Sequence, residues 1–470
     1  MFRTVEMPLW LLILLLGFAV VTFASHFLFP SVRWFFRRRL ERAVSKLNEK
    51  LERPIQPFKL ARRHDMIQRL IYDPQVSEAI ADHARAEGIP ESVAFEQAKR
   101  YAREIVPSFS ATAYFGFAIR AARFLSNSFY RVRLGHLDEG ALQRIDPQAT
   151  VIFVMNHRSN MDYVLVTYLA AERSALSYAV GEWAQVWPLS RLIRAMGAYF
   201  IRRQSRNELY RRVLARYVRL ATDGGVTQAM FPEGGLSQTG ALTPPKLGLL
   251  NYIIDGHDPE GRDVVFVPVA LNYDRVLEDR ILIEAASSRD RRFNARIDKV
   301  AAKGLYQIWL RLTGRYHRFG YAAVSFGTPV SLRAFRYETP GDPTRALARH
   351  LMRKIGQIVP ILPVPVVSWM ILQHSPMSRA EIEIGMGEMV AALPHAHVHL
   401  PRHNRDYAVE VGLRHLLERR VLIEQDGRYA ANPDEVDLLR YYANSIRHLI
   451  PPSDPALAAP AKEVSAPAGS

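Results

Sequence analysis

The sequence predicts an α/β fold, a mixed sheet flanked by helices, with helical regions at both ends and an N-terminal transmembrane helix. Two observations support this prediction. Between residues 131 and 335, short apolar runs alternate with segments of helical spacing, which is typical of strand–helix units. Residues 7–29 contain no Lys, Arg, Asp or Glu. About 23 helical residues, at ~1.5 Å each, span a ~30 Å hydrocarbon core.

The flanks of this apolar run predict its orientation. A cluster of basic residues follows it, and positive charge on one flank places that flank on the cytoplasmic side. We therefore expect a single-pass protein of the cell (inner) membrane with the later sequence in the cytoplasm. A cleaved signal peptide, in which basic residues come first, and an interfacial helix are the alternatives. The cluster comprises Arg33, Arg37, Arg38, Arg39, Arg42 and Lys46.

The composition limits the expected partners and the kinds of catalysis open to this chain. The net charge of +16 favours a polyanionic neighbour, and beside an apolar N-terminal run we expect anionic membrane lipids. The chain has no cysteine, which excludes disulfides, thiolate catalysis and Cys-ligated zinc. Nucleic acid is the alternative polyanion, suggested by a helix followed by a hairpin at residues 404–431. Glu410 and Glu418 offset the positive charge of that helix, so we expect no nucleic-acid partner.

The most informative segment is HRSNMD at residues 157–162, directly after the apolar run at 150–155. This pattern predicts a strand that carries His157 to the edge of a sheet, with Ser159 capping a helix at 161–171. Asp162, five positions after His157, is placed to fix the imidazole tautomer and raise its basicity. The alternative is an ordinary strand-to-helix corner with a polar cap.

Three further apolar runs end in polar or glycine residues, as sites in open α/β sheets do. They are GAYFIRR at 197–203, FPEGGLSQTG at 231–240 and VVFVPVALNYDR at 264–275. In this order, the four blocks resemble the glycerol-3-phosphate/lysophospholipid acyltransferase superfamily. The flanks at 124–133 and 438–449 and the Arg158-Ser159 pair are similar to its membrane-bound glycerol-3-phosphate acyltransferase branch. The resemblance covers roughly residues 60 to 450 and implies an acyltransferase-like fold.

The resemblance implies acyl transfer from acyl-CoA or acyl carrier protein to the sn-1 hydroxyl of glycerol 3-phosphate, with His157 as general base and Asp162 orienting it. Glu233 is expected to orient an arginine or accept a backbone N–H, and the paired glycines allow close backbone approach. Cationic candidates suit the acceptor phosphate. The chemistry needs no cofactor, and no third ligand for a metal is evident. The substrate-binding candidates are Arg158, Arg202, Arg203, Glu233, Gly234, Gly235 and Lys246.

One departure from the family pattern bears on the acceptor. Leu236 and Gln238 stand where the third motif usually carries arginines, and charged hydrogen bonds are worth ~1.5–3 kcal/mol each. Either Arg202, Arg203 and Lys246 compensate, or the acceptor is another molecule, such as lysophosphatidic acid. A degenerate scaffold that has lost activity is a third interpretation.

The domain organisation follows from these blocks. The apolar stretch at 111–129 is either an interfacial or a buried helix, and the three prolines of 359–372 favour a buried or interfacial connector over a spanning helix. Ser378 and Glu381 have capping-box spacing, and Asp426-Gly427 predicts a hairpin. The expected segments are an anchor (1–30), a basic juxtamembrane segment and helical domain (31–130), a catalytic α/β domain (131–340), a C-terminal helical domain (341–450) and a disordered tail (451–470).

Overall fold

The computed structural model describes residues 8–17, 38–39, 42–170, 174–181, 185, 189–202, 205, 207–287, 319–338, 342–393 and 405–451. The chain divides into two compact units: Met1–Ile55 with Glu172–Ser174, and Gln56–Ala171 with Ala175–Ser470. In the first unit, residues 9–17 and 42–48 are helical.

The transmembrane helix expected at residues 7–29 falls largely beyond the described part of the chain, since residues 18–29 lie outside it. Among the helices that are described, none combines the length and the apolar character needed to cross a bilayer. The membrane-spanning segment therefore remains a prediction.

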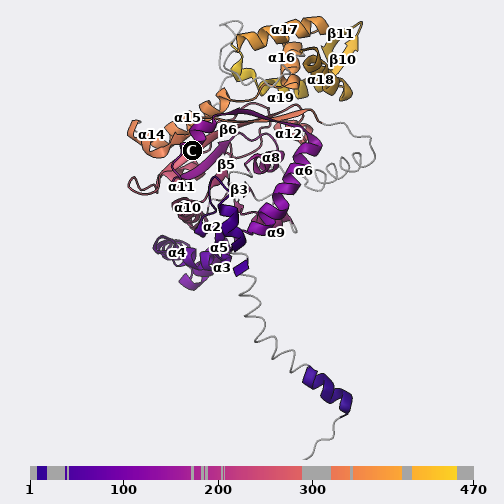
Figure 1. The fold of residues 1–470 in the computed structure, drawn as a ribbon. Helices are drawn as coiled ribbons and strands as arrows, with labels where there is room; N and C mark the ends of the chain where they lie inside the picture. The colour runs from indigo at the N-terminus through magenta and orange to yellow at the C-terminus, as the bar shows by residue number, and fades with distance from the viewer. Residues whose placement is uncertain are drawn as a thin grey trace, which may run out of the picture. The chain divides into compact units, whose positions relative to one another are not determined.

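Within the described residues of the second unit, eight strands form one sheet in the order β1-β7-β6-β2-β5-β3-β4, with β8 paired to β6 (Figure 1). Within the run β6-β2-β5-β3-β4 each strand is parallel to the next, and β1 is parallel to β7. β6 runs antiparallel to β7 and β8, so the sheet is mixed, as predicted. The strands are β1 (Arg131–Leu137), β2 (Thr150–Met155), β3 (Ser177–Gly181), β4 (Tyr199–Ile201), β5 (Gln228–Met230), β6 (Val264–Tyr273), β7 (Tyr321–Phe326) and β8 (Val330–Ser331).

Helices cover both faces of this sheet, which is why its central strands are continuous apolar runs. Side chains of β2 alternate between two buried clusters: Val151, Phe153 and Met155 belong to one, Ile152 and Val154 to the other. The first cluster includes side chains from α6 (Ile119–Phe129), which continues η1 (Thr112–Ala118), and from α8 (Met161–Leu169). The second includes those of α3 (Arg63–Ile71), α4 (Pro74–Glu87), α5 (Glu91–Ile105), α10 (Glu208–Asp223), α11 (Gly248–Ile254) and α15 (Pro343–Gln357).

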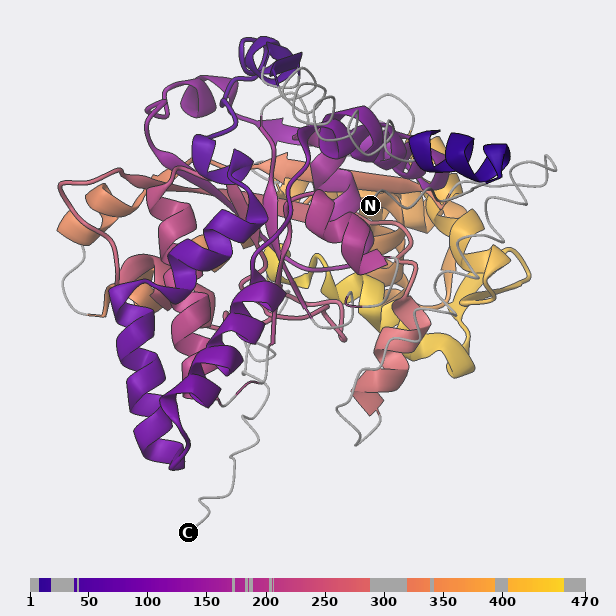
Figure 2. The same cartoon turned by 90° about the horizontal axis from the view of Figure 1, so that it is seen from below.

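Shorter helices fill the connections, and the purple helices α3, α4 and α5 pack side by side (Figure 2). The N-cap of α10 is Asn207, whose side chain accepts from the backbone N–H of Tyr210, and the N-cap of α5 is Pro90. The remaining helices of this region are α2 (Pro57–Leu60), α7 (Glu139–Gln143), α9 (Leu189–Ala195), α12 (Asp279–Ser287) and α14 (Leu332–Glu338).

The C-terminal region adds four helices and a small antiparallel sheet, in the order β10-β11-β9. The hairpin predicted at Asp426-Gly427 is confirmed, with Leu422 opposite Ala431, and so is the capping box of Ser378 and Glu381. The elements are α16 (Pro363–His374), β9 (Met377–Ser378), α17 (Arg379–Ala392), α18 (Arg405–Glu418), β10 (Leu422–Gln425), β11 (Arg428–Ala431), η3 (Pro433–Glu435), α19 (Val436–Asn444) and η4 (Arg447–Leu449).

The proline-rich segment at 359–372 is buried, as one expectation had it, but it is not a connector: from Pro363 it forms the helix α16. Pro363 and Pro365 lie in the first turn, where backbone N–H groups have no partner within the helix. The intervening N–H of Val364 donates to Asp274 Oδ1 over 2.9 Å. The prolines therefore start this helix. The tail expected to be disordered lies outside the described residues after residue 451.

Candidate active site

The predicted base and carboxylate meet in the turn between β2 and α8. His157 Nδ1 lies 2.9 Å from Asp162 Oδ2, and both side chains are buried. The imidazole stacks on the Phe231 ring, with centroids 3.9 Å apart, and meets the Tyr163 ring edge-on at 5.5 Å. The ring is therefore fixed in orientation by one hydrogen bond and two aromatic neighbours.

Asp162 accepts four hydrogen bonds, which satisfy a carboxylate with no exposed surface. Besides His157, Oδ2 accepts from the backbone N–H groups of Arg158 at 2.7 Å and Ser159 at 3.0 Å. Oδ1 accepts from the hydroxyl of Tyr273 at 2.6 Å. Because a carboxylate faces Nδ1, that nitrogen carries the proton and the lone pair is on Nε2, the tautomer of a general base.

Glu233 ties the loop after β5 to the base. Its Oε1 accepts from the His157 backbone N–H at 3.0 Å, and its Oε2 accepts from the N–H and hydroxyl of Thr243 at 3.0 and 2.7 Å. Burial raises the pKa of the Glu233 carboxyl. The backbone N–H of Ser237 donates to the His157 carbonyl at 2.9 Å. Glu233 therefore binds backbone N–H groups, one of the two roles expected of it.

A polar pocket of about 460 Å³ opens beside this loop. Its lining carries three cationic side chains, those of Arg202, Arg211 and Lys246, and includes Phe231, whose ring stacks on the base. Gly234 has φ +68°, and a Cβ there would lie 2.6 Å from Lys246 Cδ. Glycine is required at this position because the lysine side chain crosses the loop against it.

The Arg202 guanidinium is paired with other side chains of the protein. Its Nε and one terminal nitrogen donate to Glu104 at 2.9 and 2.6 Å, and its guanidinium lies 5.3 Å from the ring centroids of both Tyr101 and Tyr210. Two of its three guanidinium nitrogens are therefore occupied by Glu104. Lys246 and Arg211 are the pocket's other cations, and Arg211 pairs with Glu208 on its own helix at 2.7 Å.

The remaining predicted site residues are placed differently. Arg158 is buried and does not line the polar pocket. Its guanidinium donates to the Gly240 carbonyl and lies 5.0 Å from the centre of the Tyr441 ring. Gly235 is half-buried in the same loop as Gly234. Arg203 lies outside the described residues.

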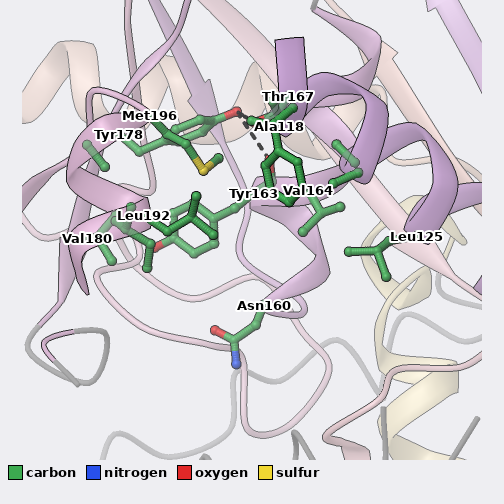
Figure 3. Close-up of a pocket in the computed structure, with 15 residues that line it drawn as sticks. Ala118, Leu125, Asn160, Tyr163, Val164, Thr167, Tyr178, Val180, Leu192 and Met196 are labelled. Atoms are coloured by element: carbon green, nitrogen blue, oxygen red, sulfur yellow. Dashed lines mark hydrogen bonds between the residues drawn. The ribbon is translucent and has the colours of Figure 1, made fainter. Parts of the chain in front are cut away.

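An apolar pocket of about 270 Å³ lies beside α8 (Figure 3). Figure 3 places Asn160 at one end and the hydrogen-bonded pair of Tyr178 and Thr167, whose oxygens are 3.1 Å apart, at the other. Tyr163, which contacts the His157 ring, also lines it. Its small and apolar lining includes Ala118, Ala121, Ala122, Leu125, Val164, Leu192, Ile193 and Met196.

Strand β3 separates the two pockets. Tyr178 and Val180 line the apolar pocket, whereas Ala179 between them lines the polar one, because successive side chains of a strand point to opposite faces. Near the base, the rings of Tyr163 and Phe231 lie 4.9 Å apart, one from each pocket. His157 contacts both rings and therefore stands where the two pockets approach each other.

Sequence reasoning missed Tyr273 and Arg211. Tyr273 ends β6, inside a recognised block, but its contact with Asp162 depends on β6 lying next to β2. Arg211 is one of several arginines on α10, and nothing in the sequence separates it from the others. Leu236 packs against the apolar core. Across the described part of the chain, no group of three or more His, Asp or Glu side chains is arranged to hold a metal ion.

Comparison with known proteins agrees with this geometry. Residues 138–272, which include the base and the paired glycines of the third block, match the acyltransferase family model. Residues 310–461 match the model of the glycerol-3-phosphate acyltransferase C-terminal region. The chain is therefore similar to acyltransferases in its first matched region and to glycerol-3-phosphate acyltransferases in its second.

Relatives of this chain include the glycerol-3-phosphate acyltransferase of Pseudomonas putida, 28% identical over 424 residues that cover 83% of this chain and 49% of the relative. The enzyme of that name from Pseudomonas fluorescens is 31% identical over 281 residues, or 59% and 32% of the two chains. The chain thus spans about half the length of these curated relatives. A solved lysophosphatidic acid acyltransferase from Thermotoga maritima is 17% identical, with a TM-score of 0.32, over 55% of this chain and 79% of its own.

Proposed function

We propose that this protein transfers an acyl group from acyl-CoA or acyl carrier protein to the sn-1 hydroxyl of glycerol 3-phosphate, forming lysophosphatidic acid for phospholipid synthesis. The observation that carries the proposal is that the base of the His157–Asp162 pair contacts one ring of a cationic pocket, Phe231, and one ring of an apolar pocket, Tyr163. The names of the relatives support the same acceptor.

In the proposed reaction, His157 Nε2 takes the proton of the acceptor hydroxyl as the oxygen attacks the thioester carbonyl. The C–O bond forms and the C–S bond breaks, and the leaving thiolate takes the proton from the His157 imidazolium to depart as the free thiol. Asp162 holds the imidazole and stabilises the imidazolium that forms between the two steps. This scheme uses no enzyme nucleophile, metal or cofactor. Both substrates contribute through positioning, which converts a bimolecular step into one within a complex.

The acceptor phosphate is assigned to the polar pocket. A dianion needs charged donors, and the lining supplies Lys246, Arg211 and the remaining donor of Arg202. Glu104 neutralises part of the Arg202 charge, so we assign the main phosphate contacts to Lys246 and Arg211. Arg203 follows Arg202 directly and is kept as a further candidate on the resemblance alone.

The acyl chain is assigned to the apolar pocket, where methylene groups leave water for a lining of aliphatic and aromatic carbon. The carbonyl end of the chain then lies near Asn160, the lining residue closest to the base in the sequence. The methyl end points toward Tyr178 and Thr167.

We propose further that the apolar pocket opens toward an anionic membrane on the cytoplasmic side, with residues 7–29 as anchor. Phe117 and Leu192, which line that pocket, are 58% and 39% exposed, and Phe124 on the same helical segment is 53% exposed. Exposed arginines accompany them, and apolar side chains among basic ones are typical of an interfacial surface. The arginines are Arg120, Arg123 and Arg191.

The test is an assay of membrane fractions with labelled palmitoyl-CoA, offered glycerol 3-phosphate or lysophosphatidic acid in parallel, with His157→Ala as the inactive control. Lysophosphatidic acid formed from glycerol 3-phosphate, and lost in His157→Ala, is the expected result. Phosphatidic acid made only from the lyso acceptor would overturn the acceptor assignment and identify the alternative enzyme, with Leu236 and Gln238 marking the change. If palmitoyl-CoA gives no product, acyl carrier protein replaces it as donor, and silence with both donors refutes the proposal.

A further inference from the structure

Glu278 is a buried carboxylate in the connection between β6 and α12, one residue before α12 begins. Its Oε2 accepts from the hydroxyl of Ser159 at 2.8 Å. Its Oε1 accepts from the side-chain amide of Asn160 at 3.1 Å and from the Asn160 backbone N–H at 3.3 Å. Every hydrogen bond described for this carboxylate therefore goes to the turn that carries the base.

The two residues that Glu278 holds have different neighbours. The backbone N–H of Ser159 donates to Asp162 Oδ2 at 3.0 Å, and its hydroxyl oxygen accepts from Met161 N at 3.1 Å, at the start of α8. Asn160 lines the apolar pocket. A shift of Glu278 would thus move the base's partner on one side and the pocket end on the other.

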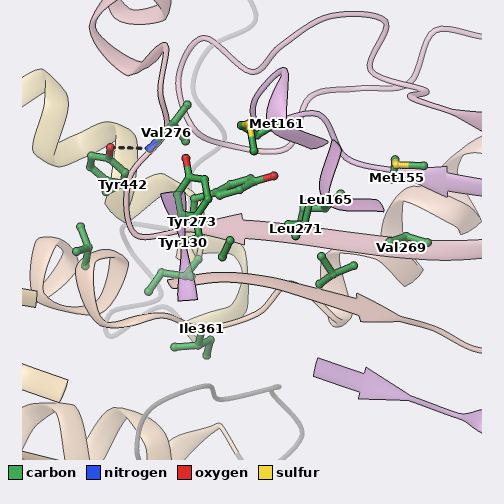
Figure 4. Close-up of a cluster of buried hydrophobic side chains, with 14 of the residues drawn as sticks. Tyr130, Met155, Met161, Leu165, Val269, Leu271, Tyr273, Val276, Ile361 and Tyr442 are labelled. Carbon is green, nitrogen blue, oxygen red and sulfur yellow. Dashed lines mark hydrogen bonds between the residues drawn. The ribbon is translucent and has the colours of Figure 1, made fainter. Parts of the chain in front are cut away.

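Glu278 is itself held in place by the C-terminal region. The Tyr442 hydroxyl accepts from the Val276 backbone N–H at 3.1 Å (Figure 4). It also donates to Asp279 Oδ2 at 2.5 Å. Arg419 closes the network with a 2.7 Å ion pair to Asp279. The residues on both sides of Glu278 are therefore fixed by Tyr442 of α19 and by Arg419, which directly follows α18, and this holds its carboxylate in place.

Burial raises the pKa of the Glu278 carboxyl, and the nearby charge of Asp162 acts in the same direction. The three donors from Ser159 and Asn160 oppose this effect, because they stabilise the ionised form. Two buried carboxylates thus share one turn, and such an arrangement is costly unless the turn's donors are held in place between them.

We propose that Glu278 is a positioning residue for acyl transfer: it fixes the 157–161 turn so that the base and the carbonyl end of the apolar pocket keep their relative place. The inference rests on the proposed function, since it assigns the apolar pocket to the acyl chain. Glu278 acts through Ser159 and Asn160 and touches neither reacting group.

The test compares Glu278→Gln with Asp274→Asn in the full chain. Asp274 is the matched control, because it is also buried, lies in the same connection and accepts two backbone N–H groups, from Tyr321 and Val364, away from the turn. For Glu278→Gln we expect kcat with palmitoyl-CoA and glycerol 3-phosphate to fall about tenfold or more, with the KM for glycerol 3-phosphate within about twofold. For Asp274→Asn we expect lower thermal stability and unchanged kcat per folded molecule.

A substrate-free readout separates this inference from the proposed function. In protein labelled with ¹⁵N-histidine, the His157 Nδ1–H signal, assigned by its absence in His157→Gln, reports the bond to Asp162. We expect Glu278→Gln to shift or broaden it and Asp274→Asn to leave it unchanged. An unmoved signal, or a kcat equal to wild type, refutes the positioning role. If wild type forms no product from glycerol 3-phosphate, the proposed function fails while the resonance still decides whether Glu278 holds the turn.

Discussion

The hydroxyl of Tyr273 donates to Asp162 Oδ1 over 2.6 Å, so the last residue of β6 supports the carboxylate that orients the base in the turn after β2. β6 and β2 are parallel neighbours, with Met155 opposite Val269. The contact thus joins the end of β6 to the start of α8, which follows β2, in the region where ligands bind in open α/β sheets. It extends the His157–Asp162 pair to a third member.

Tyr273→Phe removes this donor and keeps the ring. A hydrogen bond to a charged group is worth ~1.5–3 kcal/mol, so we expect kcat to fall about tenfold or more with little change in either KM. Tyr130→Phe is the matched control: its ring centroid lies 5.3 Å from that of Tyr273, but its hydroxyl donates to the Arg275 carbonyl. Steady-state kinetics on both variants check this, and equal losses would contradict a specific role for Tyr273.

Lys246→Ala tests the acceptor pocket. Loss of one charged contact to a phosphate is expected to raise the KM for glycerol 3-phosphate about tenfold or more, while the KM for palmitoyl-CoA stays within about twofold. Lys354→Ala, on α15, removes the same charge from a lysine that does not line the pocket. If the donor KM rises instead, the polar pocket belongs to the thioester substrate.

Ala121→Phe tests the apolar pocket, because Ala121 is a half-buried member of its lining. A larger side chain there shortens the space for methylene groups. We expect kcat/KM for palmitoyl-CoA to fall by about tenfold or more relative to octanoyl-CoA, with each lost methylene worth ~0.8 kcal/mol. A uniform loss with both donors would mean that the acyl chain binds elsewhere.

The absence of cysteine makes the interfacial surface testable with single-site dyes. Phe124→Cys, labelled with an environment-sensitive dye in vesicles containing anionic lipid, is expected to be quenched by brominated acyl chains. Tyr72→Cys is the control, since Tyr72 is 66% exposed and follows α3, which packs on the opposite face of the sheet. Equal quenching at the two positions, or none at position 124, would contradict the predicted contact between α6 and the membrane.

Asp274 predicts a pH dependence of stability. Burial raises its pKa to about 7, whereas an exposed aspartate titrates near 3.8. Between these values the folded state binds more protons than the unfolded state, so this group's contribution to stability falls as pH rises from about 4 to about 7. The slope is at most about 1.4 kcal/mol per pH unit. Urea unfolding across this range is expected to be flatter for Asp274→Asn, and parallel curves would contradict the shift.

Much of the fold follows from local pattern. The run at 150–155 and the ten residues of β6 were identified as strands because buried strands are continuous apolar sequence. The α16 helix was missed because its prolines suggested a break. They lie in the first turn, and the N–H between them is satisfied by Asp274, far away in the sequence.

The site divides in the same way. His157 and Asp162 lie within one turn, so their spacing in the chain already brings them together. Tyr273 and Glu278 are more than a hundred residues from Asp162 in the sequence. They reach the turn only because β6 pairs with β2 in the sheet. Arg158 was expected to bind phosphate because it is a cation beside the base, but its guanidinium lies on Gly240 and Tyr441.

The alternation of Tyr178, Ala179 and Val180 along β3 also bears on kinetics. Under the proposed function, the water-soluble acceptor and the apolar acyl chain of the donor bind on opposite faces of one strand. Each substrate then has its own entrance, so neither blocks the binding of the other. The two substrates add in random order, and a high concentration of either does not exclude its partner. The rate of acyl transfer would therefore respond to the concentration of both substrates, the water-soluble phosphate ester and the activated fatty acid.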